Sequence, residues 1–216
     1  MAHPVTIWTY DWVPEGPRGF VRDLRLRWAC EELGTPYEIK TVSFENRSAE
    51  HFSRQPFGQV PFLDDGPIRV FESGAALLHL ARKSEVLMPT DPVDAAQVEQ
   101  WVFAALNSVE MVTMPWIVLT WSKLEAQPIS EWLDKRLGQI ETVLANTDYL
   151  VADRFTVADL LMADALRVEL VRKHGDRPAS EAYVERITGR PAFRKAYEDQ
   201  LAHFAAADEK RDEETV

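Results

Sequence analysis

The spacing of apolar residues changes once along the 216-residue chain, from strands mixed with helices to a purely helical period. In the first part, runs rich in β-branched and aromatic residues predict strands over 5–10 and 37–42. Apolar residues recur at helical spacing over 19–33, and a second, short helix is expected over 46–54. Beyond residue 93 no strand pattern is found, so we predict an α/β domain followed by an all-α domain.

The stretch 57–82 contains the most informative pattern of the first part. It predicts a strand over 60–63, a turn at Asp64-Asp65-Gly66-Pro67, a strand over 68–71 and then a helix. Pro61 removes a ladder donor where a strand begins, which favours a cis Val60–Pro61 bond. Glu72 and Ser73 place a carboxylate and a hydroxyl at the N-terminus of the helix, an arrangement that suits a ligand with both an ammonium and a carboxylate.

The second part of the chain predicts helices and their boundaries. Apolar spacing indicates helices over 94–121 and 129–146, and Pro115 is expected to kink or break the first of them. Thr156 and Asp159 have the spacing of a capping box, in which each side chain bonds to the backbone N–H of the other. Pro191 suits the first turn of a last helix, whereas the charged tail over 205–216 is expected to fray.

Composition excludes several classes of function. Hydrophobic residues make up 46% and charged residues 27% of the chain, and the net charge of −11 argues against nucleic acid and an anionic membrane surface. No apolar run approaches the roughly 20 residues that span a bilayer, and the N-terminus has no signal-peptide pattern. The single Cys30 permits no internal disulfide, so we expect a cytoplasmic protein in which this residue is structural. No residue spacing suggests a metal site.

Two segments resemble a known family. Ser53-Arg54-Gln55-Pro56-Phe57-Gly58-Gln59-Val60-Pro61 and the following Phe71-Glu72-Ser73 resemble the glutathione-binding half of the cytosolic glutathione S-transferases, of bacterial type with a binding half like the plant phi class. The resemblance covers about 5–204. It implies a thioredoxin-like α/β domain (1–82), a linker (83–92), an all-helical substrate and dimerisation domain (93–204) and the charged tail.

The resemblance also implies a set of ligand contacts. In the family, the backbone next to the cis-proline pairs with the cysteinyl unit of glutathione, which assigns Gln59, Val60 and Pro61. The Glu72-Ser73 pair then holds the γ-glutamyl end. Basic residues of the second helix, here Arg47 and His51, contact the glycine carboxylate in relatives, although a solvated helix face would also explain them.

The group that activates the glutathione thiol departs from the family pattern. The thiolate is the nucleophile, and a hydrogen-bond donor or a positive charge near the sulfur lowers the thiol pKa. No serine occurs before residue 30 and no cysteine before Cys30, so the activators of the serine and cysteine classes are missing. Tyr10, at the end of the first strand, is the first candidate, with a core or edge tyrosine as the alternative. Arg18 is the second candidate.

Two functions remain open from the sequence. The first is an enzyme of detoxification that conjugates the glutathione thiolate to a small hydrophobic electrophile, with the substrate contacts taken from Trp12, Met111, Met114 and Trp116, unless these side chains serve ordinary packing. The second is a transferase-like protein that binds glutathione or a partner protein without turnover. The resemblance implies a homodimer in either case, with Phe57 inserted into the partner subunit.

Overall fold

The computed structural model describes residues 4–215, which form two compact units. One unit joins the chain up to Leu80 with the segment from Pro191 onward, and the other is Ala81–Arg190. The last helix thus belongs with the first unit, a grouping that differs from the domain boundaries expected from the sequence.

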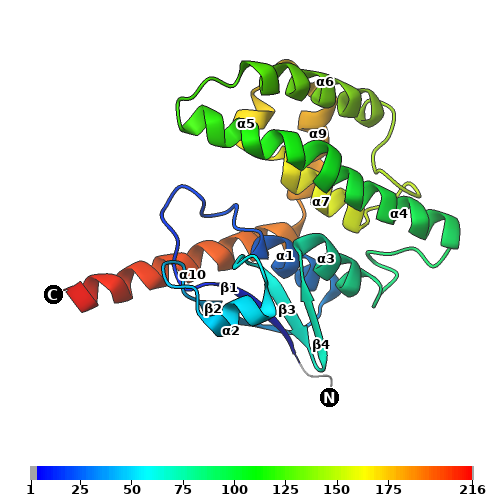
Figure 1. Cartoon of the computed structure of the whole chain (residues 1–216). Helices are drawn as coiled ribbons and strands as arrows, with labels where there is room; N and C mark the ends of the chain where they lie inside the picture. Colours follow the sequence, from blue (N-terminus) through cyan, green and yellow to red (C-terminus); the bar gives the residue numbers. More distant parts are fainter. Residues whose placement is uncertain (1–3, 216) are drawn as a thin grey trace. The chain divides into compact units, whose positions relative to one another are not determined.

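The first unit is built on a four-stranded mixed sheet (Figure 1). Its strands are β1 (Val5–Tyr10), β2 (Tyr37–Val42), β3 (Phe62–Asp65) and β4 (Ile68–Phe71), in the spatial order β2-β1-β3-β4. β1 pairs parallel with β2 and antiparallel with β3, and β3 pairs antiparallel with β4. The predicted bounds of β1, β2 and β4 are confirmed. This is the thioredoxin-like sheet that the resemblance implied.

The hairpin between β3 and β4 corrects one expectation. Asp64 and Asp65 lie inside β3, opposite Arg69 and Ile68, and only Gly66 and Pro67 form the turn. Gly66 has a φ of 62°, which a two-residue hairpin turn requires and which glycine adopts without a steric penalty. The strand extends beyond its apolar run because both aspartates have partners: Asp64 accepts from Trp8 of β1, and Asp65 lies 2.7 Å from the ring nitrogen of His79.

Four helices complete this unit: α1 (Asp23–Leu33), α2 (Ala49–Arg54), α3 (Ser73–Ala81) and α10 (Pro191–Thr215). α2 covers one face of the sheet, while α1 and α3 cover the other (Figure 1). α1 begins four residues later than the predicted Gly19, which has a left-handed φ of 78° that does not fit a helix. The predicted fraying from residue 205 is wrong, because α10 continues to Thr215.

The second unit is all-helical, as expected. Its elements are α4 (Pro92–Ala104), the π-helical turn η1 (Ala105–Glu110), α5 (Met111–Trp121), α6 (Gln127–Leu144), α7 (Val157–Leu166), α8 (Glu169–Arg172) and α9 (Pro178–Thr188). Every residue of α7 is buried, and this helix contacts α4, η1 and α9. α7 is therefore the centre of the helical core.

Pro115 does not break its helix. The backbone stays helical from Pro92 to Trp121, and the π turn η1 lies directly before α5, the helix that contains the proline. In η1 the Met111 N–H bonds to the Leu106 carbonyl, five residues back. Proline lacks an N–H and crowds the preceding turn, so a widened turn there lets the helix continue.

The same helix also corrects the expectation about apolar length. Within residues 4–215, the stretch Pro92–Trp121 has the length and composition of a membrane span, with a mean hydropathy of 1.6 in its most apolar window. Charged residues interrupt the run, so counting consecutive apolar residues misses it. Of that window 44% is buried inside the structure, where the helix contacts α6 and α7.

The predicted capping box at the start of α7 is confirmed. Asp159 Oδ2 accepts from the Thr156 N–H at 2.8 Å, and Thr156 Oγ1 accepts from the Ala158 N–H at 3.3 Å. Asp159 Oδ1 also accepts from the Leu150 N–H and from the Tyr183 hydroxyl, both at 2.9 Å. Burial raises the pKa of Asp159, although these hydrogen bonds oppose the shift. One carboxylate therefore joins α7, the preceding loop and α9.

We predict that Asp159→Ala strongly destabilises the protein. The change leaves buried donors on Thr156, Leu150 and Tyr183 without an acceptor, at a cost of about 1–3 kcal/mol for each such group. The measurement is urea unfolding, with Asp148→Ala as the control because Asp148 is an exposed aspartate paired with Arg186. Equal midpoints for the two variants would contradict the role of Asp159.

Candidate functional site

The register of the sheet gathers the predicted ligand-binding residues at one end. Trp8 pairs with Phe62, and Phe62 pairs with Phe71, in antiparallel directions. Continuing these registers by one or two residues brings the end of β1 beside Val60, and the start of α3 beside Pro61 and Val60. Tyr10, the Val60–Pro61 bond and the Glu72-Ser73 pair therefore meet at the same edge of the sheet.

The loop 55–61 is held by its own first residue. Gln55 is 2% exposed, and its side-chain carbonyl accepts from the Phe57 N–H at 2.6 Å and the Gln59 N–H at 3.3 Å. The Gln55 main-chain carbonyl accepts from the Gly58 N–H at 2.9 Å. These bonds close a compact turn directly before Val60, and apart from the family resemblance no local pattern predicts them.

His51 supports this loop rather than a solvated helix face. It is 1% exposed in α2, and its Nε2 lies 2.9 Å from the Gln59 carbonyl. A carbonyl oxygen only accepts, so Nε2 donates this bond. His51 is therefore a support for the loop backbone, and both sequence interpretations, a carboxylate contact and a solvated residue, differ from this placement.

Val60 presents an unpaired backbone edge. The Val60–Pro61 bond is cis, as the sequence favoured. In the part of the chain that the structure describes, neither the N–H nor the carbonyl of Val60 has a hydrogen-bond partner. A partly exposed peptide with both groups free is able to pair with an extended ligand backbone, as one strand pairs with another.

The start of α3 differs in detail from the prediction. Ser73 is the first residue of α3, and the Glu72 carbonyl accepts the first helical bond, from the Ala76 N–H at 2.9 Å. Glu72 has a φ of 71°, a left-handed conformation that costs a residue with a side chain about 1–2 kcal/mol. Strained backbone of this kind occurs mainly at functional sites. The exposed Glu72 therefore lies just outside the helix that begins at Ser73.

A buried arginine stands behind Ser73. Arg25 is 2% exposed in α1, and its Nη1 donates to the Ser73 hydroxyl at 3.1 Å. The guanidinium adds positive charge to that of the α3 N-terminus, so this point of the site favours an anion. Our sequence interpretation missed Arg25. The available signal was the alternation Leu24-Arg25-Leu26-Arg27, which places arginines on helix faces that are buried.

Tyr10 and Arg47 form a pair beside the loop. Arg47 Nη2 donates to the Tyr10 hydroxyl at 3.2 Å and its Nε donates to the Gly58 carbonyl at 2.9 Å. The Tyr10 hydroxyl reaches the same carbonyl at 3.4 Å, and the guanidinium lies 5.3 Å from the centre of its ring. Arg47 precedes α2, which begins at Ala49, and so lies outside the helix in which the sequence placed it.

Arg18 and Trp12 bind the last helix instead of the loop around Val60. Arg18 forms a two-pronged ion pair with Asp208, with distances of 2.5 and 2.7 Å, and it also donates to the Val13 carbonyl. The Trp12 indole N–H donates to Asp208 at 2.8 Å. The hydrogen bond from Arg18, and after it that from Trp12, lowers the pKa of Asp208 to about 2. The Arg18 charge is thus matched by a carboxylate, which weakens its case as a thiol activator.

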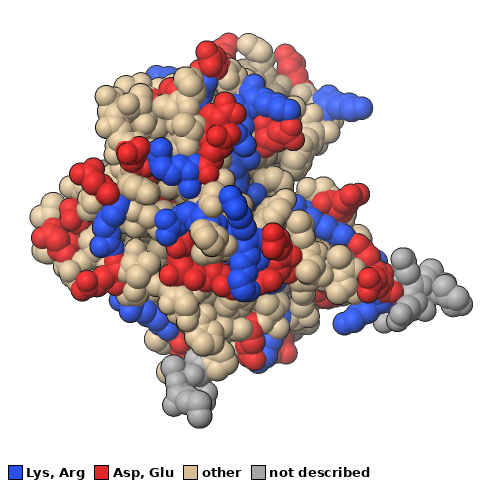
Figure 2. Space-filling view, turned by 180° about the vertical axis from the view of Figure 1, so that it is seen from behind, with Lys and Arg blue, Asp and Glu red and all other residues tan. Residues whose placement is uncertain are grey.

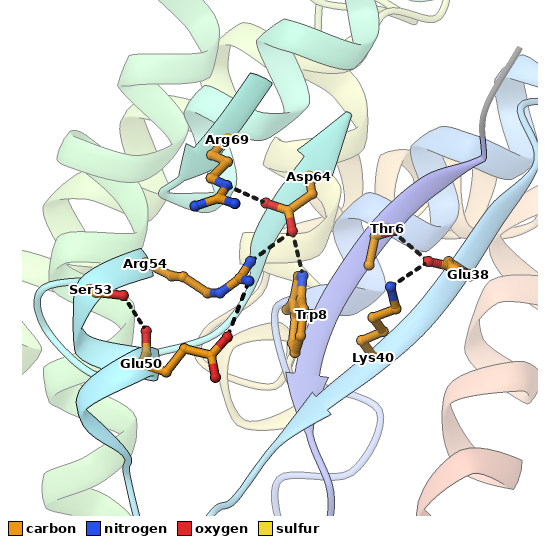
Figure 3. A network of polar contacts seen from close by, with 9 residues as sticks. All are labelled: Thr6, Trp8, Glu38, Lys40, Glu50, Ser53, Arg54, Asp64 and Arg69. Carbon is orange, nitrogen blue, oxygen red and sulfur yellow. Dashed lines mark hydrogen bonds and ion pairs between the residues drawn. The ribbon is translucent and has the colours of Figure 1, made fainter. Parts of the chain in front are cut away.

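A network on the outer face of the sheet fixes α2, and with it His51 (Figure 3). Asp64 accepts from the Trp8 indole at 3.0 Å and from Arg54 of α2 at 2.8 Å. The Arg54 guanidinium also lies 4.8 Å from the Trp8 ring and pairs with Glu50 at 3.2 Å. These contacts anchor the C-terminal end of α2, directly before the loop 55–61, to the sheet.

The remaining predicted substrate residues lie on α5 in the helical unit. Trp116 is 7% exposed and donates its indole N–H to Ser130 at 3.0 Å, which is the packing role that the sequence left as the alternative. Met111 is exposed and Met114 is partly exposed. Cys30 is buried and forms no disulfide, as expected for a structural residue.

We next consider surface charge and possible metal ligands. On the face drawn in Figure 2, acidic and basic side chains are intermixed, without a continuous basic patch. Over residues 4–215, no group of three or more His, Cys, Asp or Glu side chains is arranged to hold a metal ion.

Comparison with known proteins agrees with the fold. The glutathione S-transferase N-terminal domain family matches residues 16–82, and the glutathione S-transferase C-terminal domain family matches residues 112–191. Glutathione S-transferase 1 of Zea mays is 36% identical over 150 residues, which cover 63% of this chain and 70% of that protein.

Solved structures share the fold at lower identity. Glutathione transferase URE2P5 of Phanerochaete chrysosporium has a TM-score of 0.79 and 21% identity, covering 96% of this chain and 99% of that one. Yeast Ure2p in complex with glutathione has a TM-score of 0.77 and 23% identity, covering 91% and 99%. The match of both domain families and the identity to the maize enzyme confirm the family expected from the sequence: the chain belongs to the glutathione S-transferase family of enzymes.

Proposed function

We propose that this transferase binds glutathione along the edge of its sheet and adds the glutathione sulfur to an apolar electrophile. The main observation behind this proposal is that the Val60 N–H and carbonyl have no partner in the described residues and lie beside the N-terminus of α3. In the reaction, the thiolate forms a carbon–sulfur bond to the electrophile. The electron pair of the attacked bond moves to the leaving group, or to the acceptor atom in an addition, and the product is a thioether.

Each polar part of glutathione has a matching group. The N–H and carbonyl of Val60 pair with the backbone of the cysteinyl unit, next to Gln59 and Pro61. The carboxylate of the γ-glutamyl end binds Ser73, where the helix N-terminus and Arg25 supply positive potential. Glu72 faces the ammonium of that same end. Solved Ure2p in complex with glutathione supports a tripeptide ligand for this fold.

The sequence analysis assigned two basic residues, Arg47 and His51, to the glycine carboxylate, and we now give them different roles. Arg47 is exposed beside the Gly58 carbonyl, and we assign it to the glycine carboxylate. His51 is buried, so it acts by holding Gln59, and through it the Val60 peptide. The proposed place of action is the cytoplasm, where glutathione keeps thiols such as Cys30 reduced.

Tyr10 is our proposed activator of the thiol. Its hydroxyl accepts a bond from Arg47, and its own hydrogen goes to the Gly58 carbonyl over a long 3.4 Å. A donor in so long a bond gives up little when it turns to a sulfur. A hydrogen bond from the phenol stabilises the thiolate over the thiol, which lowers the thiol pKa and raises the reactive fraction at neutral pH.

Non-catalytic binding of glutathione is the second candidate. The observation that favours it is the lack of a serine or free cysteine in the segment between β1 and α1. Conjugation of a chloronitrobenzene, measured alongside calorimetric binding of glutathione, separates the two functions. Binding without turnover on a broad electrophile panel would favour the binding protein.

We predict that Ser73→Ala lowers glutathione affinity by one to two decades. The variant removes a hydroxyl that donates to a charged carboxylate, a bond worth roughly 1.5–3 kcal/mol. Calorimetric titration with glutathione measures the change, and Ser122→Ala, at an exposed serine after α5, is the matched control. An unchanged affinity in Ser73→Ala would remove Ser73 from the site.

Tyr10→Phe is expected to raise the pKa of the bound thiol while glutathione affinity stays nearly constant. The thiolate fraction at neutral pH then falls, so kcat drops about tenfold or more, and the loss shrinks as the pH rises past the new thiol pKa. Ultraviolet absorbance of the thiolate, titrated with pH, gives the shift directly.

Two further variants interpret that titration. Tyr149→Phe is the control, since the Tyr149 hydroxyl lies in the helical unit. Arg18→Ala tests the other candidate, because loss of a cation would raise the thiol pKa in a salt-dependent way. An unshifted thiol pKa in Tyr10→Phe would exclude Tyr10 and leave Arg18 or a backbone N–H.

We also propose a homodimer, in which Phe57 enters the partner subunit. Phe57 is 67% exposed at the tip of the loop 55–61, and Phe52 of α2 is 47% exposed. Large aromatic side chains in such positions mark protein interfaces. Light scattering at micromolar concentration is expected to give a dimer mass for the wild type and for Leu124→Ala, an exposed control. It is expected to give a smaller mass for Phe57→Ala, and a monomeric wild type would refute the proposal.

A further inference from the structure

We infer that Asp208 of the C-terminal helix is a positioning residue, which fixes the loop between β1 and α1 and thereby the groups beside the glutathione thiol. This inference rests on the proposed function. The loop spans 11–22, begins directly after Tyr10 and ends at the N-terminus of α1.

One side of α10 contacts this loop along its length. The spacing of the contacting residues keeps them on neighbouring turns of a single helix face. They are Tyr197 at Gly19, Gln200 at the Val21 carbonyl (2.9 Å) and Asp23 (2.5 Å), His203 at the Tyr10 carbonyl (3.0 Å), Asp208 at Arg18 and Trp12, and Arg211 over the Trp12 ring (4.3 Å).

The contact at Gly19 shows how closely the two segments fit. A Cβ at this position would lie 2.6 Å from a ring carbon of Tyr197, which is too close for any side chain. Glycine is therefore required both for the left-handed φ and for the approach of the helix. The loop and α10 are built as matching surfaces.

Asp208 joins the start of the loop, at Trp12, to its second half, at Arg18. One carboxylate accepts two bonds from Arg18 and one from the Trp12 indole, and Arg18 in turn donates to the Val13 carbonyl. Two-pronged arginine–carboxylate pairs fix geometry more strictly than single contacts. Because Trp12 and Arg18 lie six positions apart, this one carboxylate closes the loop into a defined shape.

The loop is held by short turns rather than by regular secondary structure: the Arg18 N–H bonds to the Glu15 carbonyl at 3.1 Å, and the Phe20 N–H bonds to the Pro17 carbonyl at 2.9 Å. It contains Pro14, Gly16 and Pro17, which prevent regular structure, and residues 14–16 are exposed. Near its start, Asp11 accepts from the N–H groups of Trp12 and Phe44. Without α10, such a segment opens at a low free-energy cost compared with the sheet.

The expected effect on function is selective. Val60, Glu72 and Ser73 are not among the residues that Asp208 contacts. We therefore expect glutathione affinity to be independent of the contacts of Asp208 with Trp12 and Arg18. Tyr10 and the N-terminus of α1 flank the loop directly. Loosening the loop therefore reduces the time that the activating group spends in position, which lowers kcat and raises the pKa of the bound thiol.

The test compares Asp208→Asn with Glu209→Gln, which removes the same charge at the exposed neighbouring position. Hydrogen exchange measured by mass spectrometry is expected to accelerate in 11–22 for Asp208→Asn only, and to stay unchanged in 55–61. Glutathione affinity is expected to remain within about twofold, the thiol pKa to rise, and kcat to fall about tenfold. Asp208→Glu keeps the carboxylate, so we expect it to recover part of the change in thiol pKa and part of the loss in kcat.

The outcomes separate this inference from the proposed function. Unchanged exchange in 11–22, or faster exchange with an unchanged thiol pKa and kcat, would overturn the positioning role. A wild type that binds glutathione without turnover would refute conjugation, and the thiol pKa of the complex would then decide the role of Asp208. An equal melting temperature for Asp208→Asn and Glu209→Gln is expected, since a half-exposed ion pair contributes little to global stability.

Discussion

The pairing of Phe62 with both Trp8 and Phe71 is the constraint on which the binding edge depends. These two antiparallel registers decide which residues follow each strand at the same end of the sheet. A slip of one residue would turn every side chain of β3 to the other face and separate the Val60 peptide from α3. The stacked rings of Trp8 and Phe62, with centroids 5.3 Å apart, and the Asp64 bonds to Trp8 and Arg54 specify this register.

In the proposed binding mode, the sheet edge recognises glutathione through its backbone and uses side chains for support. Val60 offers its peptide groups, while the buried Gln55 and His51 hold that peptide from behind. Arg25 does the same for Ser73. A rigid backbone site loses little entropy on binding, because no long side chain has to be ordered around the ligand. The residues behind the site are therefore as important for its geometry as those that face the ligand.

The sequence predicted what depends on neighbours along the chain. The β-branched runs of β1 and β2 and the capping box of Thr156 and Asp159 are local signals, and all were confirmed. The proline at the start of a strand likewise predicted the cis bond before Pro61, whereas the family resemblance added the thioredoxin-like fold. What the sequence missed depends on distant partners: Arg25 behind Ser73, the burial of His51, and the helical tail that ends the chain. The charged composition of the tail favours a flexible segment, and only the contact of Asp208 with Arg18 accounts for its order.

The contact between Asp208 and Arg18 joins residues 190 positions apart, and this separation determines when the contact can form during translation. The chain emerges from its N-terminus, so β1 to β4 are all synthesised before the last helix exists. A nascent chain therefore passes through a stage in which the strands have left the ribosome but the loop after Tyr10 lacks its contacts with α10. The loop acquires these contacts only after Asp208 has been translated, so its final geometry depends on residues that are synthesised much later than the loop itself.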